Sequence, residues 1–460
     1  MSGDCRHCLD FSRTQLLRRA AAEAGRGLPT IEPGMPVPAG TGLSRRSFLA
    51  KSAGLALAVY GAGSLGLRQL EEGIASAATG PAKTVLVSIF LEGGADGLSL
   101  LYPDGDPLYR KLRPKLALPT GAGPAFAADS RLRWHPALAP LAQLDGEGKV
   151  VSLPAVGYTH PDQSHFTSRH YWEVGATDQH LLTGWLGRTL DVIGTMDNPL
   201  QGLSLDGQLA PSLASSKVPV AAIEGVSYSF WTSNVWGQVE DRMLDTLAHL
   251  GAAKRSDPGL ETASAITMEA HRLRTQLLPF SGDKGVTSPV VYPKSDDSFP
   301  QSLAGLAALL AAGLPLRCVA LSAPGAYDTH ADQAGDLAKG LDLTAQSLLA
   351  FQRDLEARGL ADRVLVHVWS EFGRRAQENG SAGTDHGAAG VGFVVGSQVA
   401  GGSIGEFPGL AGAGLDADGN VAATSDFRGV YSALLEQWLG VDAERVIPGA
   451  KAFARPKLVR

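Results

Sequence analysis

Cysteine is scarce in this chain of 460 residues, and the positions of its three cysteines exclude a disulfide framework. Cys5 and Cys8 have the CxxC spacing of some metal sites, but they lie near the N-terminus and lack a second pair of ligands. Cys318 is the only cysteine after residue 77. We therefore expect the main body of the chain to be held together by its hydrophobic core alone, as a chain of this length can be.

Positive charge and long apolar runs are also limited. The chain has 40 Lys and Arg residues against 46 Asp and Glu residues, and no basic cluster lies outside its N-terminal segment. Nucleic acid is therefore not expected as a partner. The uncharged apolar run of residues 52–67 is shorter than the ~20 residues that a membrane-spanning helix needs, so no stable membrane span is expected.

Residues 61–66, "GAGSLG", match the glycine pattern of a dinucleotide-binding loop. Such a loop is followed by an acidic residue about 20 positions further on, at the end of the next strand. Residues 73–91 contain no acidic residue, which excludes this interpretation. Small residues in the apolar core of an export sequence account for the pattern.

The N-terminal segment has the pattern of a twin-arginine export signal. Arg45 and Arg46 precede the apolar run, and an A-x-A cleavage site ends at residue 77. Residues 1–77 are therefore predicted to be a signal peptide with a long, disordered polar start, handled by the twin-arginine translocase. The alternative is a signal anchor that stays uncleaved. The protein is expected to be exported, to the periplasm, the cell surface or the medium.

Beyond residue 77, apolar β-branched runs alternate with helical patterns. Strands are predicted at the start of residues 83–101 and at 149–158, 316–324, 363–370 and 391–396, and helices after residue 163 and at 302–313, 331–358 and 426–440. This alternation predicts one α/β domain, residues 78–460, with a mostly parallel central sheet and helices on both faces. Residues 208–300 are interpreted as an α-rich insertion.

Reactive side chains lie at the ends of these predicted strands. They are carboxylates, imidazoles and a hydroxyl: Asp96, Ser164, Asp328, His330, Glu371, Asp385 and His386. In open α/β sheets, sites form at the carboxyl ends of strands, so these residues are expected to meet at one edge. This set of groups is typical of a divalent-metal site with a candidate nucleophile.

Several of these residues also have simpler explanations. Asp96 could belong to a glycine turn, and Ser164 could be a helix N-cap. Glu371 follows an apolar strand and needs a partner, either an arginine or a metal. Asp328 and His330, two residues apart in an extended segment, point to the same side and could share one ion.

Asp385 and His386 are adjacent, so in an extended segment they point to opposite sides. We therefore expect one of them to be a ligand and the other to support it.

Several motifs together resemble a known family. They are "IFLEGGADGLSLLYP", "DQSHF", "YDTH", "SEFGR", "TDHG" and "DFRGVYSALLEQWLG", behind the export signal. With them the chain resembles, over residues 83–440, the exported bacterial proteins of the DUF1501 family. That family is distantly similar to the alkaline phosphatase/sulfatase-like superfamily, whose members hold one or two divalent metals at the carboxyl edge of a sheet.

The resemblance implies roles for individual residues. Asp96 takes the first ligand position, and Ser164 takes the position of the nucleophile, with Thr167 as its rival. Asp328 and His330 follow as ligands.

The later positions depart from the superfamily in part. Ser370 and Glu371 stand where the superfamily has an Asp-His pair, and His386 supplies the last histidine. The Ser-Glu replacement removes one imidazole, so a mononuclear or altered site is compatible with the sequence.

The implied function is that of an exported metal-dependent hydrolase acting on phosphate or sulfate esters. Its cofactor would be one or two ions of Zn, Mn, Mg or Ca, and its substrate an anionic ester. Arg169, Arg374 and Arg375 would bind the remaining ester oxygens. His165 would serve as general acid or base. The alternative is a catalytically inactive metal- or ligand-binding protein, or an accessory component of a surface complex.

Overall fold

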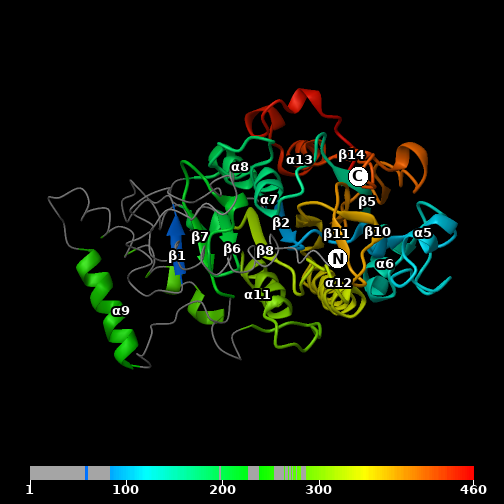
Figure 1. Cartoon of the computed structure of the whole chain (residues 1–460). Coiled ribbons are helices and arrows are strands. Elements are labelled where there is room, and N and C mark those ends of the chain that lie inside the picture. The colour runs from blue at the N-terminus through cyan, green and yellow to red at the C-terminus, as the bar shows by residue number, and fades with distance from the viewer. Residues whose placement is uncertain are drawn as a thin grey trace.

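A ten-stranded sheet forms the centre of the protein, as the computed structural model shows (Figure 1). The structure describes residues 57–60, 83–195, 198–225, 238–252 and 286–460, with isolated residues between 264 and 280. Across the sheet the strands are, in order, β1 (Leu57–Tyr60), β7 (Val220–Ile223), β6 (Gly202–Ser204), β8 (Cys318–Ser322), β2 (Val85–Phe90), β9 (Val364–Trp369), β12 (Gly390–Val395), β5 (Val150–Gly157) and β13 (Gly402–Ser403), with β14 (Ser425–Asp426) also paired to β5.

Most neighbouring strands run parallel. β7, β6, β8, β2 and β9 form a continuous parallel set, whereas β12 runs antiparallel to both of its neighbours, β9 and β5. The beginning of β12 therefore lies at the same edge of the sheet as the carboxyl ends of β2, β8 and β9. The predicted mostly parallel α/β architecture is confirmed.

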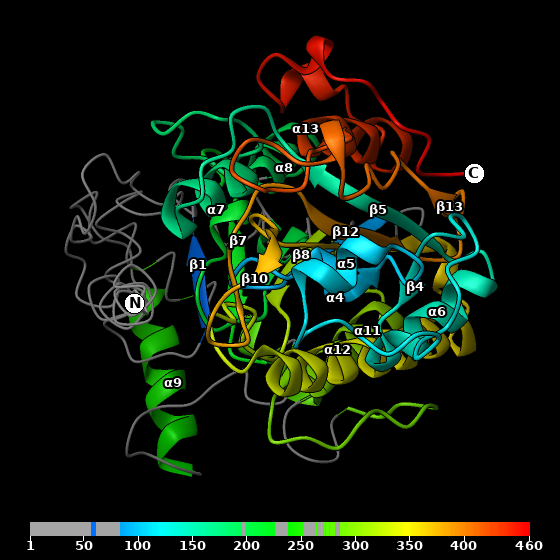
Figure 2. The same cartoon turned by 45° about the vertical axis from the view of Figure 1, so that its right-hand side comes forward.

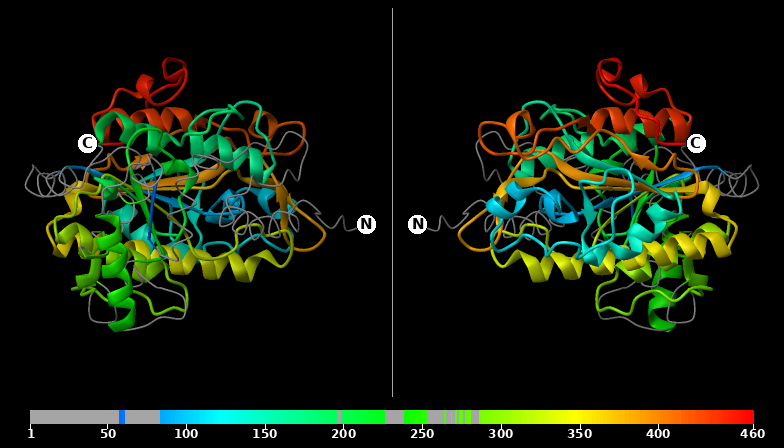
Figure 3. Two further views of the ribbon diagram at one scale, coloured as in Figure 1. Left: turned by 90° about the vertical axis from the view of Figure 1, so that its left-hand side faces the viewer. Right: turned by 90° about the vertical axis from the view of Figure 1, so that its right-hand side faces the viewer.

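Helices cover both faces of the sheet (Figures 2 and 3). One face packs against α6 (Ala139–Gly146), α11 (Phe299–Ala311) and α12 (Gln333–Ala357), and the other against α7 (His165–Val174), α8 (Trp185–Ile193) and α13 (Phe427–Leu434). The remaining helices and strands lie around these layers: α4 (Gly97–Leu100), β3 (Leu101–Tyr102), α5 (Pro107–Leu112), β4 (Arg133–Trp134), α9 (Gln238–Gly251), β10 (Arg374–Glu378) and β11 (Thr384–His386).

Periodicity explains the two layers. Every residue of β2, β9 and β12 is buried, as expected for strands covered on both faces. Leu337, Leu341 and Leu348 of α12 recur with helical spacing and lie in the core on one side of the sheet. On the other side Gly440, in the left-handed conformation (φ 68°), ends the helical segment that begins with α13.

The helices and strands predicted in residues 83–101, 149–174 and 302–440 are confirmed. β6 and β7 were not predicted, because runs of three and four residues carry little periodicity. β7 lies inside residues 208–300 and is paired with β1 and β6, so that stretch contributes a strand of the central sheet as well as helix α9. The predicted signal peptide lies outside the described residues except for β1, which pairs with β7.

No helix among the described residues is long and apolar enough to cross a membrane.

His367 is a titratable group in the middle of the core. It lies in β9, its side chain is 2% exposed, and its ring meets that of Tyr431 edge-on with 5.5 Å between centroids. Within the described part of the chain, its Nδ1 has no hydrogen-bond partner. Burial lowers the pKa of His367 to about 3. At pH values between about 3 and ~6.5, the folded protein therefore keeps this imidazole neutral. In the unfolded chain, the same imidazole is protonated over this range because its pKa is near ~6.5.

We expect His367→Leu to flatten the acid sensitivity of the fold. As pH falls from about 6.5 towards 3, His367 binds a proton in the unfolded chain but not in the folded protein. The free energy of unfolding therefore falls by up to ~1.4 kcal/mol per pH unit because of this group. Leucine removes that contribution and suits the surrounding apolar core. Urea unfolding at pH 7, 6 and 5 measures the difference in slope.

The matched control is His180→Leu, because the His180 side chain is exposed. It should keep the wild-type pH profile. Parallel profiles for wild type and His367→Leu would contradict the prediction.

Candidate metal centre

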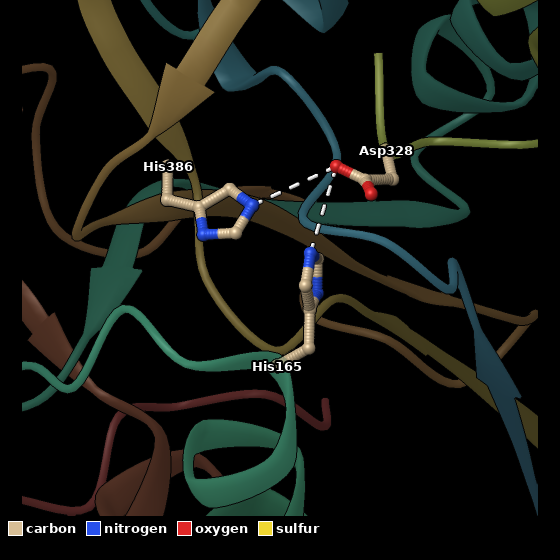
Figure 4. Close-up of side chains that lie close together, drawn as sticks. All are labelled: His165, Asp328 and His386. Atoms are coloured by element: carbon tan, nitrogen blue, oxygen red, sulfur yellow. Dashed lines mark ion pairs between the residues drawn. The ribbon is translucent and has the colours of Figure 1, made fainter. Parts of the chain in front are cut away.

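Three side chains converge at the carboxyl edge of the sheet (Figure 4). His165 is the first residue of α7, Asp328 lies in the loop after β8, and His386 ends β11 just before β12. One ligand atom from each of the three lies within 4.8 Å of the others. Two imidazoles and a carboxylate at this spacing could hold a metal ion.

The two imidazoles approach one oxygen of Asp328. His165 Nε2 lies 3.5 Å from Asp328 Oδ1, and His386 Nε2 lies 3.6 Å from the same atom. The two rings meet nearly at right angles, with 4.4 Å between their centroids. All three groups therefore face a common centre.

Contacts behind the imidazoles fix which nitrogen faces that centre. His386 Nδ1 lies 2.8 Å from the backbone carbonyl oxygen of Gln163, which can only accept, so Nδ1 carries the proton and Nε2 presents its lone pair. Burial lowers the pKa of His386 to about 4, so the ring is neutral at neutral pH. This Nε2 atom lies 3.6 Å from the carboxylate oxygen, so both atoms could bind one cation placed between them.

His165 is oriented by Glu371. Its Nδ1 lies 2.8 Å from Glu371 Oε1. Burial by itself lowers the pKa of His165, but hydrogen bonds to Asp328 and Glu371 and the charges of both carboxylates outweigh it and raise the pKa. Glu371, expected among the metal ligands, thus lies behind His165, where it holds the ring in place.

The Glu371 carboxylate is itself held by a glycine turn. The backbone N–H groups of Gly93 and Gly94 donate to it at 3.0–3.3 Å. Both glycines have positive φ, and a Cβ on Gly93 would lie 2.4 Å from the backbone nitrogen of Asp328. Only glycine allows the turn to approach Asp328 so closely. The glycines noted in the sequence therefore serve both the carboxylate and the loop that carries Asp328.

Asp328 has two further partners. Arg374 Nη2 donates to Asp328 Oδ1 at 2.7 Å, and His330 Nε2 lies 3.1 Å from the same oxygen. Burial would raise the pKa of Asp328, but its contacts with the imidazoles of His165, His330 and His386 and the charge of Arg374 hold the pKa well below its usual range. The carboxylate therefore stays ionised.

His330 and Asp385 form a contacting pair next to the three converging side chains. His330 Nδ1 lies 3.3 Å from Asp385 Oδ1, which also accepts from Asn379 Nδ2 at 3.1 Å. Of the adjacent pair at 385 and 386, His386 faces the centre and Asp385 faces His330.

Asp96 does not face the centre. Its carboxylate is completely buried and forms a two-pronged ion pair with Arg113, at 2.5 and 2.9 Å, while Ser99 and Gln333 donate to it as well. Burial raises the pKa of Asp96, but Arg113 and these donors more than offset it. Its four donors occupy the carboxylate, so the structure does not bring Asp96 together with the other predicted ligands.

The candidate nucleophiles lie on the first turn of α7. Ser164 is its N-cap and accepts from the backbone N–H of Phe166 at 3.3 Å, and Thr167 is buried.

The predicted anion-binding arginines differ in their surroundings. Arg169 pairs with Glu173 and Glu92. Arg374 is buried and donates to Asp328 and to backbone carbonyls, including those of Gly94 and Thr384. Arg375 follows it on β10, and strand alternation places its side chain on the opposite face.

Sequence reasoning missed three supporting groups. Arg113, Gln333 and the carbonyl of Gln163 all contact site residues or their neighbours, yet none lies in a recognisable motif. The sequence predicts acid–base chemistry for His165, and the position of this residue at the start of a helix in "DQSHF" is the available clue to a ligand role.

Comparison with known proteins gives a family and a set of similar structures. A family model described as a protein of unknown function (DUF1501) matches residues 160–450. No curated protein matches the chain. The family expected from the motifs is confirmed.

Three solved structures are similar in outline. The lipoteichoic acid synthase LtaP from Listeria monocytogenes is 9% identical, with 81% of this chain and 74% of that one covered and a TM-score of 0.31. A protein in the alkaline phosphatase superfamily from Vibrio parahaemolyticus is 9% identical, with 85% and 79% covered and a TM-score of 0.32. The PsFucS1 sulfatase from Pseudoalteromonas sp. is 13% identical, with 85% and 77% covered and a TM-score of 0.33.

We expect Glu371→Gln to lower the pKa of His165 in the metal-free protein. The substitution keeps the shape but removes the negative charge that favours the imidazolium. A pH titration of the imidazole signals by ¹H–¹⁵N NMR measures the change. Glu173→Gln is the matched control, since Glu173 is also buried and lies on α7 but pairs with Arg169. An unchanged His165 pKa in Glu371→Gln would show that the contact does not govern this ring.

Proposed function

The chain belongs to the DUF1501 family, and we propose that it is an exported protein that binds one divalent metal ion at His165, Asp328 and His386 and hydrolyses phosphate or sulfate esters with it. One observation carries the metal site: His386 Nε2, whose ring is neutral, turns its lone pair towards a carboxylate oxygen of Asp328.

The donor set bears on which metal would fit. Imidazole nitrogens with one carboxylate suit Zn²⁺ or Mn²⁺, whereas Mg²⁺ and Ca²⁺ prefer oxygen ligands throughout. Two of the carboxylates that the sequence offered as ligands are already paired with arginines. Arg374 binds Asp328, and Arg113 binds Asp96. A mononuclear site therefore fits these residues better than a dinuclear one.

The chain's own groups would prepare the site for an anionic ester. When bound, a divalent cation lowers the pKa of a water molecule and offsets negative charge on a phosphoryl or sulfuryl oxygen. Glu371 and the Gln163 carbonyl hold the two imidazoles in position. The amino-terminal end of α7 adds a favourable potential for an anion beside His165. Ser164, with Thr167 as its rival, is the proposed nucleophile if hydrolysis passes through a covalent ester.

A non-catalytic role is the second candidate. The Ser164 hydroxyl is engaged as a helix cap, and Arg169 and Arg374 are engaged by protein acceptors. These contacts favour a protein that binds a metal or an anionic ligand without turning it over, alone or within a surface complex.

We also propose export by the twin-arginine translocase. Arg45, Arg46 and the A-x-A site at residues 75–77 support it. Because this route carries folded proteins, the metal could be inserted before export.

We expect the purified protein to hold about one equivalent of Zn or Mn, measured by elemental mass spectrometry without chelators. Asp328→Ala and His386→Ala remove a ligand each and should lose the metal, because fewer than three protein ligands remain. His180→Ala removes an exposed imidazole elsewhere and should keep it.

An ester panel then separates the two candidate functions. Metal-dependent hydrolysis of a phosphate or sulfate ester would support the enzyme, and metal without turnover would favour the binding protein. Absence of bound metal, together with no thermal shift on adding Zn²⁺ or Mn²⁺, would rule out the proposed site.

A further inference from the structure

A buried glutamine joins the segments that carry the site. Gln333 is the first residue of α12 and is 1% exposed. Its Nε2 donates to Asp96 Oδ2 at 2.6 Å and to Ser99 Oγ at 3.3 Å. Its Oε1 accepts from Thr329 Oγ1 at 2.9 Å and from Thr384 Oγ1 at 2.6 Å. Both donors and both acceptor positions of the amide are thus in use.

Arg113 extends this junction. Besides its two bonds to Asp96, it donates to the backbone carbonyls of Arg375 and Ala376 at 2.9 Å each. Arg113 and Asp96 are completely buried. The junction therefore connects the turn after β2, the loop after β8, β10 and β11.

Each partner of Gln333 is close in the chain to a site residue. Thr329 directly follows Asp328, and Thr384 lies two residues before His386. The backbone N–H of Thr384 also donates to the carbonyl of Thr329 at 3.0 Å. Asp96 follows the glycine turn that holds Glu371. A substitution of Gln333 would thus change the positions of both the segment that carries Asp328 and the segment that carries His386.

The backbone beside Gln333 is held in an uncommon conformation. Asp332 and Ala382 have φ values of 46° and 54°, in the left-handed region that non-glycine residues rarely adopt. They sit in facing loops, where Asp332 N donates to Ser381 O at 3.1 Å and Gln333 N donates to Ala382 O at 3.0 Å. Such strain persists only where surrounding contacts enforce it.

The stability of the fold does not require this junction to consist of buried polar and charged groups. An ion pair removed from water costs several kcal/mol of desolvation, and apolar residues of similar volume often serve a fold equally well. A polar junction instead fixes directions and distances, since each hydrogen bond tolerates only a narrow geometry.

We propose that Gln333 is a positioning residue that, through Asp96, Arg113, Thr329 and Thr384, sets the separation of Asp328 and His386 and thereby the affinity of the metal centre. The inference rests on the proposed metal site. Gln333 acts through its neighbours and is not itself a ligand.

The test compares two buried glutamines of the same helix. Gln352 is 3% exposed and donates to Glu356 and Ser397, away from the site. Gln333→Met and Gln352→Met each remove hydrogen bonds of a buried amide and should both lower thermal stability. Only Gln333→Met should weaken Co²⁺ binding, by about 10- to 100-fold, and alter the visible absorption of the Co²⁺-loaded protein.

Two results would overturn the proposal. One is a Gln333→Met protein with wild-type Co²⁺ affinity and spectrum, and the other is an equal loss of affinity in Gln352→Met. If Gln333→Met does not fold, Thr384→Val removes a single donor to Gln333 with little change in shape, and the same criteria apply to it.

A metal-free measurement separates this proposal from the proposed function. If the wild-type protein binds no Co²⁺, the metal site fails, but the positioning role is still tested by the imidazole NMR signals of His165 and His386. These signals should shift in Gln333→Met and stay in place in Gln352→Met. Unchanged signals in Gln333→Met would reject the positioning role.

Discussion

One carboxylate oxygen organises the candidate site. Asp328 Oδ1 accepts from Arg374 at 2.7 Å and lies within 3.6 Å of the Nε2 atoms of His165, His330 and His386. These partners come from α7, β10, β11 and the loop of Asp328 itself, so the loops at this edge are ordered around a single negative charge. Because Arg374 is buried, removing that charge would leave its guanidinium beside the imidazoles without a carboxylate partner.

Topology brings these partners to the same place. In a purely parallel sheet, residues that precede a strand lie at the opposite edge from residues that follow one. β12 runs antiparallel between β9 and β5, so His386, which precedes it, joins residues that follow β8 and β9. The glycine turn after β2 packs against the same group, because Gly93 can approach the backbone of Asp328 where a residue with a side chain cannot.

The sequence predicted at which edge of the sheet the site lies and which residue types form it. It predicted fewer of the contacts that these residues make. Polar residues directly after apolar strands located Asp328 and Glu371, and the "TDHG" motif located His386. Periodicity could not show that Glu371 turns towards His165, since that depends on the two N–H groups of the glycine turn. Nor could it pair Asp96 with Arg113, because that pairing depends on how α5 and the segment after it pack, which no local motif encodes.

Charge balance connects the metal-free fold with metal binding. Asp328 is matched by Arg374, Asp96 by Arg113, and Glu371 by His165, whose raised pKa favours the imidazolium. These charges are thus compensated before any cation binds, which allows the site to form with the fold. A metal ion would need the His165 Nε2 lone pair, which is available only when that nitrogen carries no proton. Metal and proton compete for one nitrogen, and the Glu371 carboxylate that stabilises the proton then compensates the cation.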